Sequence, residues 1–451
     1  MKMISKKLGA FAAALMIMMS AGCAKNEGGS DGGSDSSPVS SGDSSAVSGG
    51  EESSNSSDTP GVPDEPEEWH ELSQTEITAA MGMGWNLGNQ LEALSGSTPK
   101  ETAWGNPEIN EALFPLVKEQ GFSTVRIPVS YLSHIGEGPD YIIEKEWLDR
   151  VQEVVDYSIN SGLYTIINIH GDGYYTIDGG WLLCAEPADK QTEIKAKYEA
   201  VWRQIAERFK NYDEHLIFES MNEEFDGKYE GPKAEAYENI NSYNQIFVDT
   251  VRKTGSNNTK RWVLMPGWNT DINSTVGDSG FKIPEDTLCE ADGKRIMISV
   301  HYYDPYNFTI NENMNEAKFQ WGKYATSGAE NSGSERSVDA AMLRLKQSFV
   351  DEGYPVVIGE LGVQDKSKYS ESFPEFRRYW TEYVVSSAKQ NGCVPVYWDN
   401  GYMYDKGFAI FDRRSIGVTQ PELIEAMMRA INAAEPYEIA APAGFEKDDA
   451  A

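Results

Sequence analysis

Apolar residues form two alternating patterns along most of the chain: short continuous runs, and longer segments in which they recur at helical spacing. The continuous runs are typical of parallel β-strands that are buried on both faces. Eight such runs occur, and we expect a strand in each: Met81–Leu87, Ser123–Pro128, Tyr164–His170, His215–Asn222, Arg261–Gly267, Ile296–Tyr302, Tyr354–Glu360 and Cys393–Trp398.

Segments of helical spacing separate most of these runs, and several of them end at a glycine that stops a helix, as at Gly121 and Gly392. The predicted helices are Glu108–Gln120, Glu146–Ser161, Glu193–Lys210, Ala236–Thr254, Ser337–Glu352, Pro374–Asn391 and Pro421–Asn432. Two long segments lack the helical pattern. We expect residues 268–295 to form a loop and residues 304–336 to be irregular.

Eight strands with intervening helices indicate an α/β fold, a single (β/α)8 TIM barrel. The alternative is an open, doubly wound sheet, which needs a glycine-rich phosphate loop after an early strand. Gly82-Met83-Gly84 is not followed by that pattern, so the barrel is favoured. Residues 69–451 contain all of the predicted elements and are expected to form one barrel domain.

The first residues predict export from the cell. In residues 1–22, three lysines precede an uncharged, mainly apolar stretch that is too short to span a bilayer, as in a secretion signal. Cys23 follows in a context that resembles a bacterial lipobox, which predicts its lipidation; an ordinary cleaved signal with a chance cysteine is the alternative. Residues 23–68 are expected to be a disordered, acidic Gly/Ser-rich linker. We therefore expect a secreted, cell-surface lipoprotein.

The formal net charge of −32 argues against nucleic acid and anionic membrane surfaces as partners. A neutral ligand suits this charge, and membrane contact is expected only through the lipid anchor. The body cysteines Cys184, Cys289 and Cys393 match no metal-binding or disulfide spacing and are expected to be packed thiols. The sequence contains no metal-binding motif, so we expect no metal or cofactor. We also expect a monomer.

Polar and aromatic side chains gather at the ends of the predicted strands, where a barrel has its reactive rim. They include Asn86, Arg126, His170, Asn222, Glu223, Trp268, His301, Tyr303, Glu360 and Trp398. Two of them, Glu223 and Glu360, are carboxylates on different strands, and glycoside hydrolysis needs such a pair. Each residue alone is readily explained as a buried structural group, so the prediction depends on the set.

The same positions resemble the signature series of glycoside hydrolase family 5. In order, the matching segments are Gly84-Trp85-Asn86-Leu87-Gly88-Asn89, Arg126-Ile127-Pro128, Asn222-Glu223, His301-Tyr302-Tyr303, Glu360 and Trp398, and the likeness extends over residues 77–432. Residues 101–107 further resemble the bacterial endoglucanase branch of that family. The resemblance implies a retaining (β/α)8 enzyme that cuts internal β-1,4 bonds of a β-glucan polysaccharide or oligosaccharide.

The resemblance also implies two catalytic roles. Glu223 would be the general acid/base and Glu360 the nucleophile, while Arg126 and Tyr303 would hold Glu360 ionised and aligned. Physical chemistry favours the same division, because a nearby cation such as Arg126 stabilises a charged carboxylate. A retaining enzyme also needs its two carboxyl groups about 5–5.5 Å apart.

Four further roles follow from the resemblance and concern the sugar. Asn222 would bond the sugar 2-hydroxyl. His170 and His301 would orient the sugar and the acid/base. Trp398 would form an apolar floor under the sugar at the cleavage point, since aromatic rings bind the apolar faces of sugars.

The expected roles of other residues near the predicted rim depend on their position alone. Trp181 and Trp268 follow the third and fifth strands, and we favour sugar contact for both. Tyr174 is a weaker candidate for sugar contact, and Asn86 is expected to support the site. Trp85 is expected to be a packing residue.

Two positions depart from the family pattern. Glu224 stands where the family often has proline, which makes it a competitor for the acid/base role; Glu223 is preferred because it directly follows Asn222. Gly171 stands where the family often has a second histidine after the third strand. Glu219 is a further strand carboxylate, and its expected role is structural, paired to a neighbour within a layer of the barrel.

The sequence also allows other functions. Xyloglucanase, lichenase and β-mannanase use the same catalytic set, because loop shape decides the substrate. A catalytically inactive, surface-tethered glycan-binding lipoprotein is the alternative from another class. The presence of both Glu223 and Glu360 argues against it, since binding alone does not need them.

Overall fold

The computed structural model of the protein describes residues 63–225, 233–326 and 334–445. The predicted secretion signal, Cys23 and the linker up to residue 62 lie outside these ranges and stay predictions. Within the described ranges, no helix is both long enough and apolar enough to cross a membrane.

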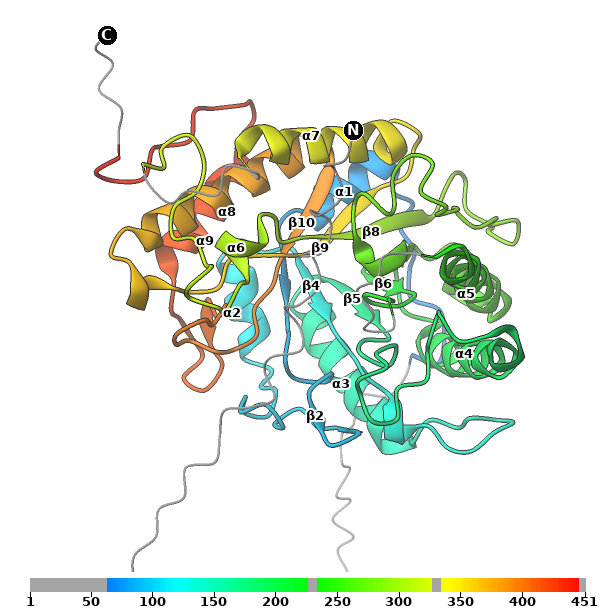
Figure 1. Ribbon diagram of the computed structural model, residues 1–451. Helices are drawn as coiled ribbons and strands as arrows, with labels where there is room; N and C mark the ends of the chain where they lie inside the picture. Colours follow the sequence, from blue (N-terminus) through cyan, green and yellow to red (C-terminus); the bar gives the residue numbers. More distant parts are fainter. Residues whose placement is uncertain (1–62, 226–232, 327–333, 446–451) are drawn as a thin grey trace, which may run out of the picture.

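Eight parallel strands close into one barrel, which confirms the predicted (β/α)8 fold (Figure 1). They are β1 (Gly84–Asn86), β4 (Thr124–Ile127), β5 (Tyr164–Asn168), β6 (Leu216–Glu219), β7 (Val263–Pro266), β8 (Ile296–Tyr302), β9 (Val356–Leu361) and β10 (Cys393–Tyr397). Each strand pairs with the next in this series, and β10 pairs with β1. Each overlaps one of the eight predicted runs, and all of their residues are buried.

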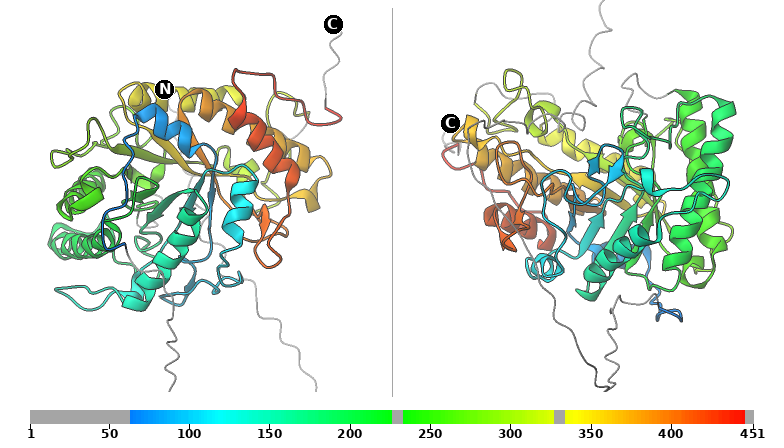
Figure 2. Two further views of the ribbon diagram at one scale, coloured as in Figure 1. Left: turned by 180° about the vertical axis from the view of Figure 1, so that it is seen from behind. Right: turned by 90° about the horizontal axis from the view of Figure 1, so that it is seen from below.

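Helices connect most of the strands and form the outer layer of the barrel. They are α2 (Leu113–Glu119), α3 (Lys145–Asn160), α4 (Ala188–Phe209), α5 (Ala234–Lys253), α6 (Tyr306–Thr309), α7 (Glu335–Leu345), α8 (Phe373–Gln390) and α9 (Pro421–Asn432). Figures 1 and 2 show α4 and α5 side by side on one flank, and α8 and α9 side by side on the opposite flank. The connection from β7 to β8, which is described throughout, contains only the short 3-10 turn Trp268–Thr270, in agreement with the predicted loop.

One helix, α1 (Gln74–Met81), precedes β1 and was not predicted. The backbone N–H of Glu76 donates to the Ser73 hydroxyl at 3.3 Å, and the Ser73 N–H donates to the Glu76 carboxylate at 2.8 Å. This capping box is a helix-start signal that can be read from a sequence. Met81 therefore ends a helix, and the prediction that the first strand begins at Met81 was wrong.

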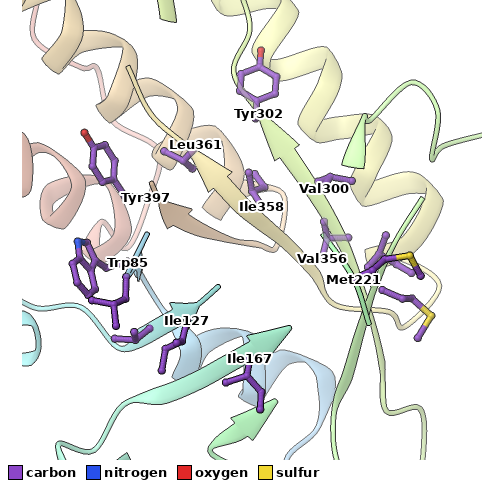
Figure 3. Packing of buried hydrophobic residues seen from close by; sticks show 14 of the residues in the cluster. Trp85, Ile127, Ile167, Met221, Val300, Tyr302, Val356, Ile358, Leu361 and Tyr397 are labelled. Atoms are coloured by element: carbon purple, nitrogen blue, oxygen red, sulfur yellow. The ribbon is translucent and has the colours of Figure 1, made fainter. Parts of the chain in front are cut away.

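Two apolar clusters lie on the two sides of the strands. The larger one fills the space between the strands and the outer helices, where Ile127 of β4 lies beside its partner Ile167 of β5 (Figure 3). The smaller one occupies the inside of the barrel and includes Ile166 of β5 together with Ile77 and Met81 of α1. Because successive strand residues point to opposite faces, one strand supplies both clusters. Helix α1 thus closes the end of the barrel at which the strands begin.

The end of the predicted linker contacts the barrel. Glu67 N donates to Asn211 O at 2.8 Å, and Asn257 Nδ2 donates to Glu67 O at 3.0 Å. Asn211 Nδ2 also donates to Pro63 O at 2.6 Å. Contact with the barrel therefore begins a few residues before residue 69.

The three body cysteines differ in burial. Cys184 and Cys393 are buried, as predicted, whereas Cys289 is only half-buried. Burial raises the pKa of the Cys289 and Cys393 thiols, which keeps both of them protonated. A raised pKa disfavours the thiolate that a nucleophilic cysteine needs.

Candidate active site

A polar layer lies above the apolar cluster inside the barrel. Side chains two residues apart on a strand share a face, so Asn168 lies above Ile166 of the inner cluster. The layer consists of Asn86 on β1, Arg126 on β4, Asn168 on β5, Glu219 on β6 and Ser299 on β8, each at most 1% exposed. Such buried polar groups are tolerated because they bond one another.

Arg126 joins this layer to the ends of the strands. Its Nε donates to Glu219 Oε2 at 2.7 Å, and its Nη2 donates to Asn222 Oδ1 at 2.7 Å. Its Nη1 donates at 3.0 Å both to Asn86 Oδ1 and to Glu360 Oε1. Because the guanidinium is a rigid, planar fork, these bonds fix Asn222 and Glu360 relative to each other.

An extra residue in β9 sets the direction of Glu360. Ile358 pairs with Val300 of β8, but the next pair joins His301 to Glu360 and passes over Gly359. The register towards β10 shifts at the same place. Bulges of this kind re-aim side chains beside active sites. A Cβ at Gly359 would lie 3.1 Å from His301 Nε2, so the bulge and the histidine together favour glycine there.

Glu223 follows β6 and lies close to Glu360. One carboxylate oxygen of each and a ring nitrogen of His301 all lie within 4.8 Å of one another. His301 Nδ1 is 2.7 Å from Glu223 Oε1 and 3.6 Å from Glu360 Oε2. Tyr303 OH donates to Glu360 Oε2 at 2.9 Å, and Tyr174 OH donates to Glu223 Oε2 at 3.3 Å. A gap of at most 4.8 Å between these oxygens is consistent with a retaining carboxyl pair, at about 5–5.5 Å, and is narrower than an inverting pair, at about 6.5–9.5 Å.

Burial and the close carboxylates set the charges at the site. Burial raises the pKa of Glu360 above its ordinary value and Glu223 adds to the rise, whereas His301 and Arg126 oppose it. Burial also disfavours the charge on Arg126, but the nearby carboxylates outweigh it and raise the pKa of the guanidinium, which stays charged. Burial raises the pKa of Tyr303 well above its ordinary value, so its phenol remains a hydrogen-bond donor.

His170 and Trp398 lie parallel to each other, with ring centroids 6.1 Å apart and ring planes 10° apart. His170 Nδ1 lies 3.5 Å from Asn168 Nδ2, which places it beside the polar layer. Burial, with help from Arg126, lowers the pKa of His170 well below its ordinary value, so the ring is neutral. Trp398 is 5% exposed and lies so close to Gly88 that a Cβ there would come within 2.8 Å of the indole.

Trp181 and Trp268 are the two predicted site residues, among those that the structure describes, with no contact to the polar layer, to Glu223 or Glu360, or to the His170–Trp398 pair. Trp181 Nε1 donates to Asp172 Oδ2 at 2.9 Å, and Lys197 Nζ lies 4.6 Å from the centre of its ring. Trp181 lines a cleft of about 270 Å³ together with Tyr141 and Lys197, and none of the groups described above lines that cleft. Trp268 is buried and packs edge-on against Phe225 at 6.2 Å. Sugar contact by either tryptophan stays a prediction.

Glu219 and Glu224, the other two glutamates near the end of β6, have different surroundings from Glu223. Glu219 is paired, as predicted, and its partner is Arg126. Glu224 is 2% exposed and packs against Gly173, where an added Cβ would lie 1.6 Å from Glu224 Oε2. The acid/base role therefore suits Glu223, which is the glutamate beside His301.

Asn168 and Ser299 were not predicted as site residues, and Tyr174 was predicted only as a weak sugar contact. Asn168 Nδ2 and Ser299 Oγ both donate to Glu219, at 2.9 and 2.7 Å. Each stands two positions before a predicted site histidine in the same predicted strand, and that period-2 spacing was an available signal. Tyr174, expected only as a weak sugar contact, lies within hydrogen-bond distance of Glu223. No sequence pattern points to that contact, because a loop makes it.

Two groups of described residues have metal-ligand atoms within 4.8 Å of one another. One is the set Glu223, His301 and Glu360; the other is Asp213, Glu214 and His215 at the start of β6. In the first group, Arg126 and Tyr303 already donate to the two oxygens of Glu360. A cation there would have to displace a guanidinium, so we assign no metal to the site.

Comparisons with known proteins agree with this geometry. The family model of Cellulase (glycosyl hydrolase family 5) matches residues 86–403. Endoglucanase A of Paenibacillus barcinonensis is 50% identical over 366 residues, which cover 80% of this chain and 90% of that protein.

Solved structures show the same likeness. The family 5 xyloglucanase of Paenibacillus pabuli is 51% identical, with a TM-score of 0.76, and the match covers 79% of this chain and all of that one. A broad-specificity endoglucanase of Bacteroides salanitronis is 38% identical, with a TM-score of 0.75, and the match covers 81% of this chain and 97% of that one. The chain therefore belongs to glycoside hydrolase family 5, as the order of its strand-end residues predicted.

Proposed function

We propose that the protein is a retaining endo-β-1,4-glucanase that cleaves a glucan by double displacement, with Glu360 as nucleophile and Glu223 as general acid/base. The observation that carries this proposal is the closeness of the two carboxyl groups, whose oxygens lie within 4.8 Å beside His301. That spacing suits direct attack by a carboxylate on the sugar, because an inverting pair, which holds a water between its base and the sugar, is about 6.5–9.5 Å apart.

In the first step, the Glu360 carboxylate attacks the anomeric carbon of the glucosyl unit, and the bond from that carbon to the leaving oxygen breaks. The proton of Glu223 passes to the leaving oxygen, and the leaving chain departs with a free hydroxyl. Arg126 and Tyr303 hold one Glu360 oxygen each, at 3.0 and 2.9 Å, which aligns the carboxylate before the attack. The product is a glycosyl ester of Glu360.

In the second step, Glu223 is a carboxylate and takes a proton from a water that attacks the same carbon. The ester bond to Glu360 breaks, and the sugar leaves with its original β configuration. His301 and Tyr174 lie within hydrogen-bond distance of the two Glu223 oxygens, which orients the carboxylate for both steps. Asn222 Oδ1 accepts from Arg126, so the Asn222 amide can direct a hydrogen to the sugar 2-hydroxyl.

The named relatives point to two related substrates. The Paenibacillus barcinonensis protein is named an endoglucanase, and the Paenibacillus pabuli protein is named a xyloglucanase. Xyloglucan has the same β-1,4-glucan backbone, so one carboxyl pair can cleave both polymers and the loops decide between them. We propose unsubstituted β-1,4-glucan as the main substrate and xyloglucan as the second candidate, which the 51% identity to the xyloglucanase supports.

Incubation with a panel of polymers tests this function. We expect reducing ends from carboxymethylcellulose, mixed-linkage β-glucan and xyloglucan, with viscosity falling early because internal bonds are cut. Proton NMR of a fresh cellohexaose digest should show the β anomer first, because two displacements restore the configuration. Release from mannan alone, initial formation of the α anomer, or no product from any polymer would contradict the proposal.

The pH dependence of the free enzyme follows from the surroundings of Glu360. Glu360 attacks as a carboxylate, so activity falls as the pH drops through its pKa, and burial raises that pKa above the ordinary 4.5. We expect the acid limb of kcat/KM to have its midpoint above pH 4.5. An activated aryl cellobioside, whose aryl leaving group needs no proton from Glu223, should show the same fall of kcat/KM at low pH. A midpoint at or below 4.5 with both substrates would contradict the assignment.

A further inference from the structure

Glu219 is a carboxylate that the reaction described above does not use. It lies inside the barrel at 0% exposure, and its two oxygens accept hydrogen bonds from three side chains. Arg126 Nε and Asn168 Nδ2 donate to Oε2 at 2.7 and 2.9 Å, and Ser299 Oγ donates to Oε1 at 2.7 Å. Three donors on two oxygens suit the ionised form. The enclosure also keeps Glu219 away from any substrate, so it is not a catalytic residue.

Glu219 and Glu360 share one guanidinium. Arg126 donates to Glu219 through Nε and to Glu360 through Nη1, and all three side chains are at most 1% exposed. His170 is neutral, because burial and Arg126 lower the pKa of its ring. A nucleophile paired with a single arginine would need no second carboxylate for charge balance in the resting enzyme. The second carboxylate therefore calls for another explanation.

The charges of the reaction cycle supply that explanation, which rests on the proposed function. In the resting enzyme Arg126 is positive, Glu219 and Glu360 are negative, and Glu223 is protonated, so the net charge of the group is −1. In the glycosyl-enzyme Glu360 is a neutral ester, while Glu223 and Glu219 are negative, so the net charge is again −1. During this change Arg126 loses its ionic contact with Glu360 and keeps the one with Glu219.

We propose that Glu219 is a positioning residue that serves as the permanent counter-ion of Arg126 while Glu360 is esterified. Without it, forming the ester would leave a buried guanidinium with no carboxylate bonded to it, which is costly at low dielectric. Glu219 thereby stabilises the glycosyl-enzyme relative to the resting enzyme. Its bond to Nε also keeps the opposite edge of the guanidinium turned towards Glu360 and Asn222.

The proposal predicts opposite effects of Glu219→Gln on the two half-reactions. The amide keeps the shape of the side chain and removes its charge. Formation of the ester should become slower, because the ester state loses its counter-ion. Hydrolysis of the ester should become faster, because the Glu360 carboxylate that it restores is then the only charged carboxylate bonded to Arg126. A residue that only maintains the fold would slow both half-reactions, since loosening the site disturbs both transition states.

The probe is 2,4-dinitrophenyl 2-deoxy-2-fluoro-β-cellobioside, which forms a long-lived ester on a retaining glucanase. We expect Glu219→Gln to be labelled about tenfold more slowly than the parent, and the purified ester to regain activity about as fast or faster. Intact-protein mass spectrometry follows the first rate, and recovery of cellulase activity follows the second. Equal slowing of both rates, or no change in either, would overturn the proposal.

Matched variants separate charge from packing. Ser299→Ala removes one hydrogen bond to Glu219 and leaves every charge in place, so the ratio of the two rates should match that of the parent. Glu219→Asp keeps the charge but withdraws it from Arg126, and should show a smaller shift in the same opposed direction. It also serves if Glu219→Gln does not fold, and equal slowing of both rates in Glu219→Asp would then overturn the proposal. Failure of the parent to be labelled would instead contradict the proposed function.

Discussion

Truncation of Glu223 and truncation of Glu360 are expected to give two chemically different inactive enzymes. On polysaccharide, Glu223→Ala should lose about 10²–10⁴-fold in kcat/KM, because the leaving oxygen then lacks its proton donor. Glu360→Ala should lose more, because no covalent ester can form. An activated aryl cellobioside distinguishes the two variants, since its leaving group needs no proton. Glu223→Ala should still form the ester from it and release a burst of phenol, whereas Glu360→Ala should not.

Azide makes the same distinction through product stereochemistry. In Glu223→Ala the small anion can enter the space of the lost carboxylate and attack the glycosyl-enzyme without a general base, which gives a β-glycosyl azide. In Glu360→Ala it can take the place of the nucleophile and attack the substrate directly, which gives an α-glycosyl azide. Proton NMR of the products distinguishes the two anomers. The same anomer from both variants, or full activity in either, would refute the assigned roles.

Glu224 supplies a matched control, because it is the adjacent glutamate. Its carboxyl packs against Gly173, whereas Glu223 lies 2.7 Å from His301 Nδ1. Glu224→Ala should therefore give no azide product from the activated substrate. A β-azide from Glu224→Ala together with none from Glu223→Ala would transfer the acid/base role to Glu224.

Replacement of Arg126 by methionine is expected to lower both stability and activity. The substitution would leave Glu219 and Glu360 buried without a cation, and breaking a buried ion pair costs about 3–5 kcal/mol of the free energy of unfolding. Urea denaturation followed by tryptophan fluorescence measures the loss. Activity should fall too, because the fork that aligns Glu360 and Asn222 is gone.

Two further variants test that explanation. Arg126→Lys keeps the charge and loses the planar fork, so most of the stability should remain while activity falls. Adding Glu219→Gln to Arg126→Met should restore part of the stability, because one of the two unpaired carboxylates is then neutral. Unchanged urea midpoints in Arg126→Met would show that the cation does not hold the buried carboxylates in place.

Elements that depend on local sequence pattern were predictable. The eight apolar runs overlap the eight strands, because a strand covered on both faces must be apolar nearly throughout. Helix α9 has the predicted bounds, Pro421–Asn432, since its proline start and apolar spacing are local features. Helix α1 was missed although Ser73 and Glu76 form a capping box, because the apolar residues at its end were read as the start of a strand.

Features that depend on contacts between strands were not predictable. The extra residue at Gly359 can be recognised only by comparing β9 with β8 and β10, because a bulge is a mismatch between partners. The contact of Tyr174 with Glu223 joins two loops that are 49 residues apart in the chain. The bond from Trp181 to Asp172 and the cleft that Trp181 lines likewise depend on how the loop after β5 folds.

By itself, the sequence determined the barrel and the family and indicated the two glutamates that we propose as catalytic, because buried strands and short motifs at strand ends are properties of contiguous residues. Only the tertiary structure decided that Arg126 is shared between Glu219 and Glu360, and that Glu219 belongs to the electrostatics of the site. The physical reason is that a carboxylate on a strand has the same local pattern whether it closes a structural ion pair or balances a reacting charge. The distances to its neighbours, which come from closing the barrel, show that Glu219 shares Arg126 with Glu360, and the two half-reactions of Glu219→Gln test which of the two roles it has.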